Sequence, residues 1–91
     1  MNIKDRVVVV TGAASGIGRS LVKAFNKHSA KHVVATDNNF EGAKAVASEF
    51  GGTAMYCDVS REGDIARVVR NTEREIGPIS IFCSNAGIGH L

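Results

Sequence analysis

A glycine-rich segment directly after four valines is the feature that most constrains the fold. Val7–Val10 predict a buried strand, and the sequence TGAASGIG follows at 11–18, where a helical pattern begins. Its glycines, Gly12, Gly16 and Gly18, allow a tight turn and close approach of the backbone to another group. The N–H groups that open a helix bind phosphate well, because the helix dipole adds about half a positive charge there. A strand, a glycine-rich turn and a helix in this order therefore predict a site for a pyrophosphate.

The rest of the chain alternates between strand and helix patterns. Strands are expected at residues 6–11, 32–36, 54–57 and 79–83. Apolar spacing predicts helices that begin near Ser15, after Asn38 or Asn39, and after Ser60, each a good N-cap. Because right-handed crossovers join parallel strands, this pattern predicts an α/β, Rossmann-type parallel sheet in the order 3-2-1-4, with helices on both faces. We expect residues 1–91 to form one such unit.

Candidate functional residues follow each predicted strand. Gly12 comes after the first strand, Asp37 after the second, Asp58 after the third and Asn85 after the fourth. In an open parallel sheet, ligands bind at the carboxyl ends of the strands, beside the point where strand order reverses. Four motifs at one edge therefore predict a ligand site at that edge.

The spacing T-G-x-x-x-G-x-G, with Asp37, Asp58-Val59 and the segment 85–87, resembles the short-chain dehydrogenase/reductase family over the whole chain. The resemblance implies cofactor contacts for Gly12, Ser15, Gly16, Ile17, Gly18, Asp37, Asp58, Val59, Asn85, Ala86 and Gly87. It implies that the N–H of Ile17 faces the pyrophosphate while its side chain packs, and that Val59 packs on the adenine ring. It also implies that Asp58 meets the adenine amino group.

Several of these positions have alternative interpretations from the residues themselves. The three glycines can merely permit a tight turn and close helix–strand packing, and Asp37 can be a solvated loop acid. Ser15 can cap the helix as well as contact phosphate, and Asp58 can cap the third helix instead of meeting adenine. For Asn85, a bond between strands is as good an interpretation as a ligand contact. Ser84 stands where the family has an asparagine, and Ser80 where relatives often carry aspartate.

Asp37 predicts a preference for NAD over NADP. A carboxylate accepts hydrogen bonds from both ribose hydroxyls of NAD, but it repels a 2′-phosphate by about 4 kcal/mol at 4 Å and an effective dielectric of 20. Even half of that energy gives more than tenfold discrimination. The neighbours Asn38 and Ser15 are neutral, whereas NADP-preferring relatives carry basic residues there.

The resemblance implies hydride transfer between NAD(H) and an alcohol or carbonyl substrate, with a catalytic tyrosine and a lysine four residues later. Tyr56 is the only tyrosine and Ser60 stands four residues on, so the sequence has no Y-x-x-x-K and no catalytic residue is assigned. We therefore expect a truncated, inactive cofactor-binding part of a larger NAD-dependent enzyme. The alternatives are a non-catalytic adenine-dinucleotide-binding module and a self-associating remnant.

Composition limits the partners and the compartment. The net charge of +2 comes from scattered basic residues, which argues against nucleic acid, and no apolar run reaches membrane-spanning length. Cys57 and Cys83 form no C-x-x-C pair and predict reduced core thiols in a cytoplasmic protein, and no cluster has metal-ligand spacing. An uncovered fourth strand would expose Ile79, Ile81 and Phe82 at a sheet edge, which predicts self-association.

Overall fold

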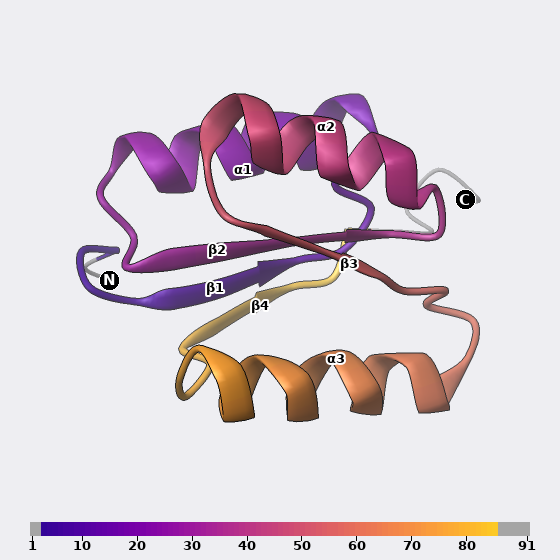
Figure 1. The fold of residues 1–91 in the computed structure, drawn as a ribbon. Helices are drawn as coiled ribbons and strands as arrows, with labels where there is room; N and C mark the ends of the chain where they lie inside the picture. The colour runs from indigo at the N-terminus through magenta and orange to yellow at the C-terminus, as the bar shows by residue number, and fades with distance from the viewer. Residues whose placement is uncertain (1–2, 86–91) are drawn as a thin grey trace.

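The computed structural model describes residues 3–85, which form a parallel sheet between two layers of helices (Figure 1). The elements are β1 Val7–Val10, α1 Gly16–Lys27, β2 His32–Asp37, α2 Phe40–Phe50, β3 Thr53–Tyr56, α3 Glu62–Glu75 and β4 Ile81–Cys83. The strand order is β3-β2-β1-β4, and all neighbouring strands pair in parallel. Helices α1 and α2 cover one face and α3 covers the other (Figure 1). The predicted α/β class and strand order are confirmed.

β1 lies at the centre of the sheet because its four valines suit burial on both faces. Val8 pairs with Val33 of β2 on one side and with Ile81 of β4 on the other. Val7–Val10 are at most 3% exposed. An uninterrupted β-branched run is typical of a parallel strand that is covered by helices on both faces.

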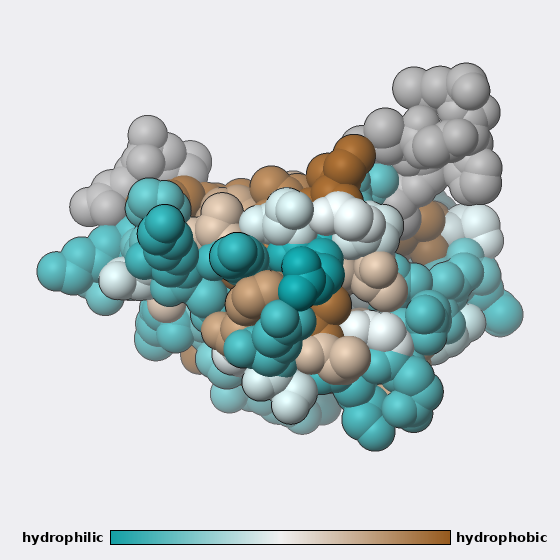
Figure 2. Space-filling model, turned by 90° about the horizontal axis from the view of Figure 1, so that it is seen from above, coloured by the Kyte–Doolittle hydropathy of each residue, from teal (hydrophilic) through white to brown (hydrophobic). Residues whose placement is uncertain are grey.

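The side chains of the sheet divide between two apolar layers. Val8, Val10, Val33 and Ala35 pack with Val22 of α1, and this layer also contains residues of α2. The opposite layer contains Val9, Val34, Cys57 and Val68 and lies against α3. Figure 2 views the α1–α2 side from outside, where hydrophilic residues surround smaller hydrophobic areas. No helix within residues 3–85 has the length and apolar character needed to cross a bilayer.

Two of the predicted helix caps are confirmed and one is wrong. The side chain of Ser15 accepts a bond from Gly18 N, and that of Asn39 accepts one from Gly42 N. Helix α3 begins after Arg61, which makes no side-chain capping bond, so the predicted cap at Ser60 is wrong. The hydroxyl of Ser60 instead donates to Asp58 Oδ1 at 2.6 Å, because that acceptor lies only two residues away.

The ends of the strands differ from the predicted bounds by one or two residues. β4 begins at Ile81 rather than at residue 79, although Ser80 N still donates to Val7 O at 2.9 Å. β3 ends at Tyr56, and the N–H of Cys57 continues the bonding toward Asp37 O at 3.1 Å. Strands often continue their bonding by a residue beyond their assigned ends, so the topology is unaffected.

Candidate functional site at the carboxyl edge of the sheet

The glycine-rich turn packs tightly against the first turn of α1. Gly12 has a φ of 64°, a conformation that glycine adopts without a steric penalty. A Cβ at Gly18 would lie 2.0 Å from the carbonyl oxygen of Gly12, closer than any side chain can approach. Gly12 and Gly18 are therefore required by the fold of the turn itself.

Gly16 is different, because the fold does not require a glycine there. A Cβ at Gly16 would meet nothing within 4 Å. Gly16 is the first residue of α1, where the N–H groups of Gly16 and Ile17 precede any intrahelical acceptor. Open space at the first residue of a helix, whose N–H groups have no intrahelical acceptor, fits a phosphate.

Asp37 is bonded to the glycine-rich turn. Its Oδ2 accepts from the N–H of Ala14 at 2.9 Å, and its Oδ1 accepts from the N–H of Asn39 at 2.9 Å. These bonds fix the carboxylate at the end of β2, beside the start of α1. A carboxylate has about four acceptor positions, so two bonds leave room for two hydroxyl donors.

Asn85 connects β4 to the same turn. Its buried amide donates to Thr11 O, Gly12 O and Ser15 Oγ at 3.2 to 3.3 Å, and its N–H donates to Thr11 Oγ1 at 2.9 Å. The structural alternative for Asn85, a bond between strands, is therefore present, and it joins the segments that follow β1 and β4. The Ser15 hydroxyl donates to Gly12 O at 2.7 Å and accepts from Gly18 N, so it braces the turn.

Asp58 follows β3 and presents one carboxylate oxygen to a local turn. Its Oδ1 accepts from both the hydroxyl and the N–H of Ser60, at 2.6 and 3.0 Å. These two bonds lower the pKa of the Asp58 carboxyl below its ordinary value. The carboxylate makes no capping bond to α3, so that alternative for Asp58 is wrong.

Two functional candidates were missed by the sequence analysis. Asp64 and Arg67 of α3 form an ion pair at 3.0 Å, and both also bond to the main chain at the end of β3. The only sequence signal is an acid and a base three residues apart on one helix, which is common on solvated surfaces.

The side chain of Ile17 does not pack as expected. It is 61% exposed, although it lies in the first turn of α1. Val59 is half-buried and packs against the apolar layer beneath α3. Ala86 and Gly87, also expected at the site, lie outside the described residues.

The two cysteines are free thiols with raised pKa values. Both thiols are free; Cys57 is buried and Cys83 half-buried. Burial raises the pKa of both thiols, which disfavours the nucleophilic thiolate. Across residues 3–85, no group of three or more His, Cys, Asp or Glu side chains is arranged to hold a metal ion.

Comparison with known proteins identifies the family. A family model described as short chain dehydrogenase matches residues 6–91. The chain is 38% identical over 86 residues to a mitochondrial borneol dehydrogenase of Lavandula x intermedia, covering 94% of this chain and 33% of that protein. The chain spans about a third of the length of the curated relatives it matches.

Two solved structures share the fold. A hydroxysteroid dehydrogenase from Escherichia coli superposes with a TM-score of 0.85 and 29% identity, over 97% of this chain and 39% of that one. A structure described as ribose-5-phosphate isomerase from Brucella melitensis 16M gives a TM-score of 0.89 and 28% identity, over 96% and 34%. With the family model matched from β1 onward, the chain belongs to the short-chain dehydrogenase family.

Proposed function

We propose that this chain is the NAD-binding part of a short-chain oxidoreductase. The bond from Ala14 N to Asp37 Oδ2 carries the proposal, because it joins a phosphate-binding turn to a ribose-binding acid. The open space at Gly16 supports it, since an empty position at a helix N-terminus suits a pyrophosphate. Asp58 would meet the adenine amino group from the adjoining strand end.

The same geometry favours NAD over NADP. Asp37 is held by two N–H groups, and its carboxylate would repel the 2′-phosphate of a ribose bound beside it. Arg19 directly follows the glycine-rich turn and is the arginine nearest to it along the sequence. Its Nη2 donates to both carboxylate oxygens of Glu49 in α2, at 2.9 Å each. The Arg19–Glu49 pair as a whole has no net charge, so it adds no positive charge with which to hold a 2′-phosphate.

In the whole protein, the proposed reaction is hydride transfer between the nicotinamide ring of NAD(H) and a small alcohol or carbonyl compound. The borneol and hydroxysteroid dehydrogenases among the relatives support this class of chemistry. We propose that the 91-residue chain alone does not catalyse it, because it has no Y-x-x-x-K. Two free thiols fit a reducing compartment such as the cytoplasm.

Titration calorimetry with NAD and NADP tests the proposal. We expect NAD to bind at least about tenfold more tightly than NADP. Equal affinities would remove the proposed role of Asp37, and no binding of either dinucleotide would overturn the proposed function. Consumption of NAD or NADH by the chain with any alcohol or ketone would contradict the predicted lack of catalysis.

A second candidate function is self-association through β4. Among residues 3–85, β4 has β1 as its one strand neighbour, so its other edge is unpaired. Phe82 is 37% exposed on this strand, with Ile81 and Cys83 half-buried beside it. Unpaired N–H and C=O groups next to apolar side chains favour pairing with another strand.

A further inference from the structure

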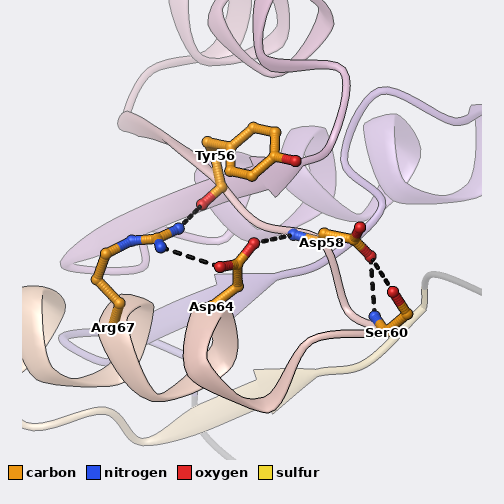
Figure 3. A network of polar contacts seen from close by, with 5 residues as sticks. All are labelled: Tyr56, Asp58, Ser60, Asp64 and Arg67. Carbon is orange, nitrogen blue, oxygen red and sulfur yellow. Dashed lines mark hydrogen bonds and ion pairs between the residues drawn. The ribbon is translucent and has the colours of Figure 1, made fainter.

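The ion pair between Asp64 and Arg67 holds the main chain on both sides of Cys57. Asp64 Oδ2 accepts from the N–H of Asp58 at 3.0 Å, and Arg67 Nη2 donates to the carbonyl oxygen of Tyr56 at 3.0 Å. Asp64 Oδ1 and Arg67 Nη1 are 3.0 Å apart, which closes the network (Figure 3). One turn of α3 therefore fixes the residue before Cys57 and the residue after it.

This arrangement is unlike an ordinary ion pair on a helix surface. Asp64 is 8% exposed and is the one buried charged residue in the part of the chain described. A buried carboxylate is costly unless it is paired and hydrogen-bonded, whereas a surface pair at this spacing adds only a few tenths of a kcal/mol. The N–H of Asp58 lowers the pKa of the Asp64 carboxyl most, followed by Arg67. The main interaction of the Asp64 carboxylate is thus its hydrogen bond with the N–H of Asp58.

The carboxylate of Asp58 consequently has one oxygen that is held by hydrogen bonds and one that is available to a ligand. Asp64 fixes the main chain of Asp58, and Ser60 occupies Oδ1. Among the described residues Oδ2 has no hydrogen-bond partner, and Figure 3 shows it pointing away from Ser60 and Asp64. A preset acceptor binds a donor without the entropic cost of ordering a flexible side chain.

We propose that Asp64 and Arg67 are positioning residues that hold Asp58 to accept a hydrogen bond from the exocyclic amino group of adenine. This inference rests on the proposed NAD site. An amino group donates to a carboxylate, whereas the 6-oxo group of hypoxanthine is itself an acceptor and is repelled. The Asp64–Arg67 pair would therefore set the discrimination between a 6-amino-purine and a 6-oxo-purine dinucleotide, beyond any effect on affinity in general.

The test compares the dissociation constants of NAD and nicotinamide hypoxanthine dinucleotide. For the wild type we expect at least about a tenfold preference for NAD, the range typical of a hydrogen bond to a charged group. Asp64→Ala should reduce the preference to about threefold or less, and Asp64→Asn should retain more of it because an amide oxygen can still accept from Asp58 N. Arg67→Lys should also reduce it, since a single ammonium lacks the fork that reaches both Asp64 and Tyr56 O.

Glu41→Ala is the matched control, because Glu41 and Lys44 form an exposed pair of the same spacing on α2, 3.7 Å apart. This variant should keep the wild-type preference. Loss of affinity for both dinucleotides by one common factor in the Asp64 and Arg67 variants would overturn the inference and leave NAD binding standing. Equal wild-type affinity for NAD and nicotinamide hypoxanthine dinucleotide would also overturn the inference and leave NAD binding standing. Wild-type protein that binds neither would instead overturn the proposed function, and the inference with it.

Discussion

The N–H of Ala14 donates to Asp37 Oδ2 at 2.9 Å, so this bond joins the glycine-rich turn after β1 to the acid at the end of β2. The two segments lie 23 residues apart in sequence, and α1 connects them. A ligand that contacts the turn with its phosphates therefore meets a carboxylate whose position is already fixed. Such preorganisation raises affinity because less ordering remains to be done on binding.

Replacement of Asp37 should alter the choice of cofactor more than the fold. We expect Asp37→Ala to weaken NAD binding about tenfold or more and to bring NAD and NADP to similar affinities, because both ribose bonds and the repulsion of a 2′-phosphate are lost. Calorimetry with both dinucleotides measures the change. Glu41→Ala removes an exposed acid four residues later and should leave the ratio unchanged. A ratio that stays at the wild-type value in Asp37→Ala would rule out this role.

Substitution of Gly18 should reduce the stability of the fold, whereas substitution of Gly16 should weaken NAD binding. Gly18→Ala should destabilise the protein by about 3 kcal/mol or more, because its Cβ would collide with Gly12 O. Gly16→Val should change the free energy of unfolding by less than about 1 kcal/mol and weaken NAD binding at least about tenfold, because its side chain would occupy the open space. Urea denaturation and NAD titration measure the two effects.

Gly63→Val is the matched control for Gly16→Val. Gly63 also lies in the first turn of a helix, and its Cβ would likewise meet nothing within 4 Å. This variant should keep both wild-type stability and NAD affinity. Gly16→Val protein that is folded and binds NAD normally would show that the space at Gly16 is not part of the site.

Stability should fall in acid because of Asp58 and Asp64. Hydrogen bonds from Ser60 lower the pKa of Asp58, and the N–H of Asp58 together with Arg67 lowers that of Asp64. The unfolded chain, whose aspartates titrate near about 3.9, then takes up protons before the folded one does. The stabilisation is complete above that pH and is lost as the pH falls through the lower folded-state values.

Denaturation curves between neutral pH and about pH 1.5 measure this loss. Asp64→Asn removes one of the two groups, so its free energy of unfolding should fall less steeply with acid than that of the wild type. Phe40→Leu, a change without a titratable group, should keep the wild-type slope. Identical slopes for Asp64→Asn and the wild type would mean that Asp64 titrates alike in the folded and unfolded states.

The sequence predicts the topology well because its strongest signals are local and agree with one another. Four valines before a glycine-rich turn favour a strand that is covered on both faces, and the alternating elements then leave few connections to choose from. The family resemblance is confirmed by the model match over residues 6–91. The meeting of Gly12, Asp37, Asp58 and Asn85 at one edge follows directly from parallel strands.

The sequence analysis was wrong about Ser60 and Ile17 and missed the role of Asp64, because each depends on which groups the folded chain brings close to that side chain. Ser60 is a good N-cap by type, but the Asp58 carboxylate two residues earlier takes its hydroxyl. Asp64 looks like a surface acid until α3 is docked, when its carboxylate faces the N–H of Asp58. Ile17 fits the apolar spacing of α1, yet its side chain is exposed, and the spacing alone does not distinguish it from the buried Val22 of the same helix.

The unpaired edge of β4 should make the protein associate. Phe82 and Phe40 are 37% and 38% exposed, but of the two only Phe82 lies on an edge strand, β4. We expect sedimentation equilibrium to show dimers or larger species, and Phe82→Lys to shift them toward monomer because a charge on an edge strand opposes strand pairing. Phe40→Lys adds the same charge on α2 and should leave the association unchanged. A wild-type monomer at high concentration, or an equal response of the two variants, would exclude β4 as the contact surface.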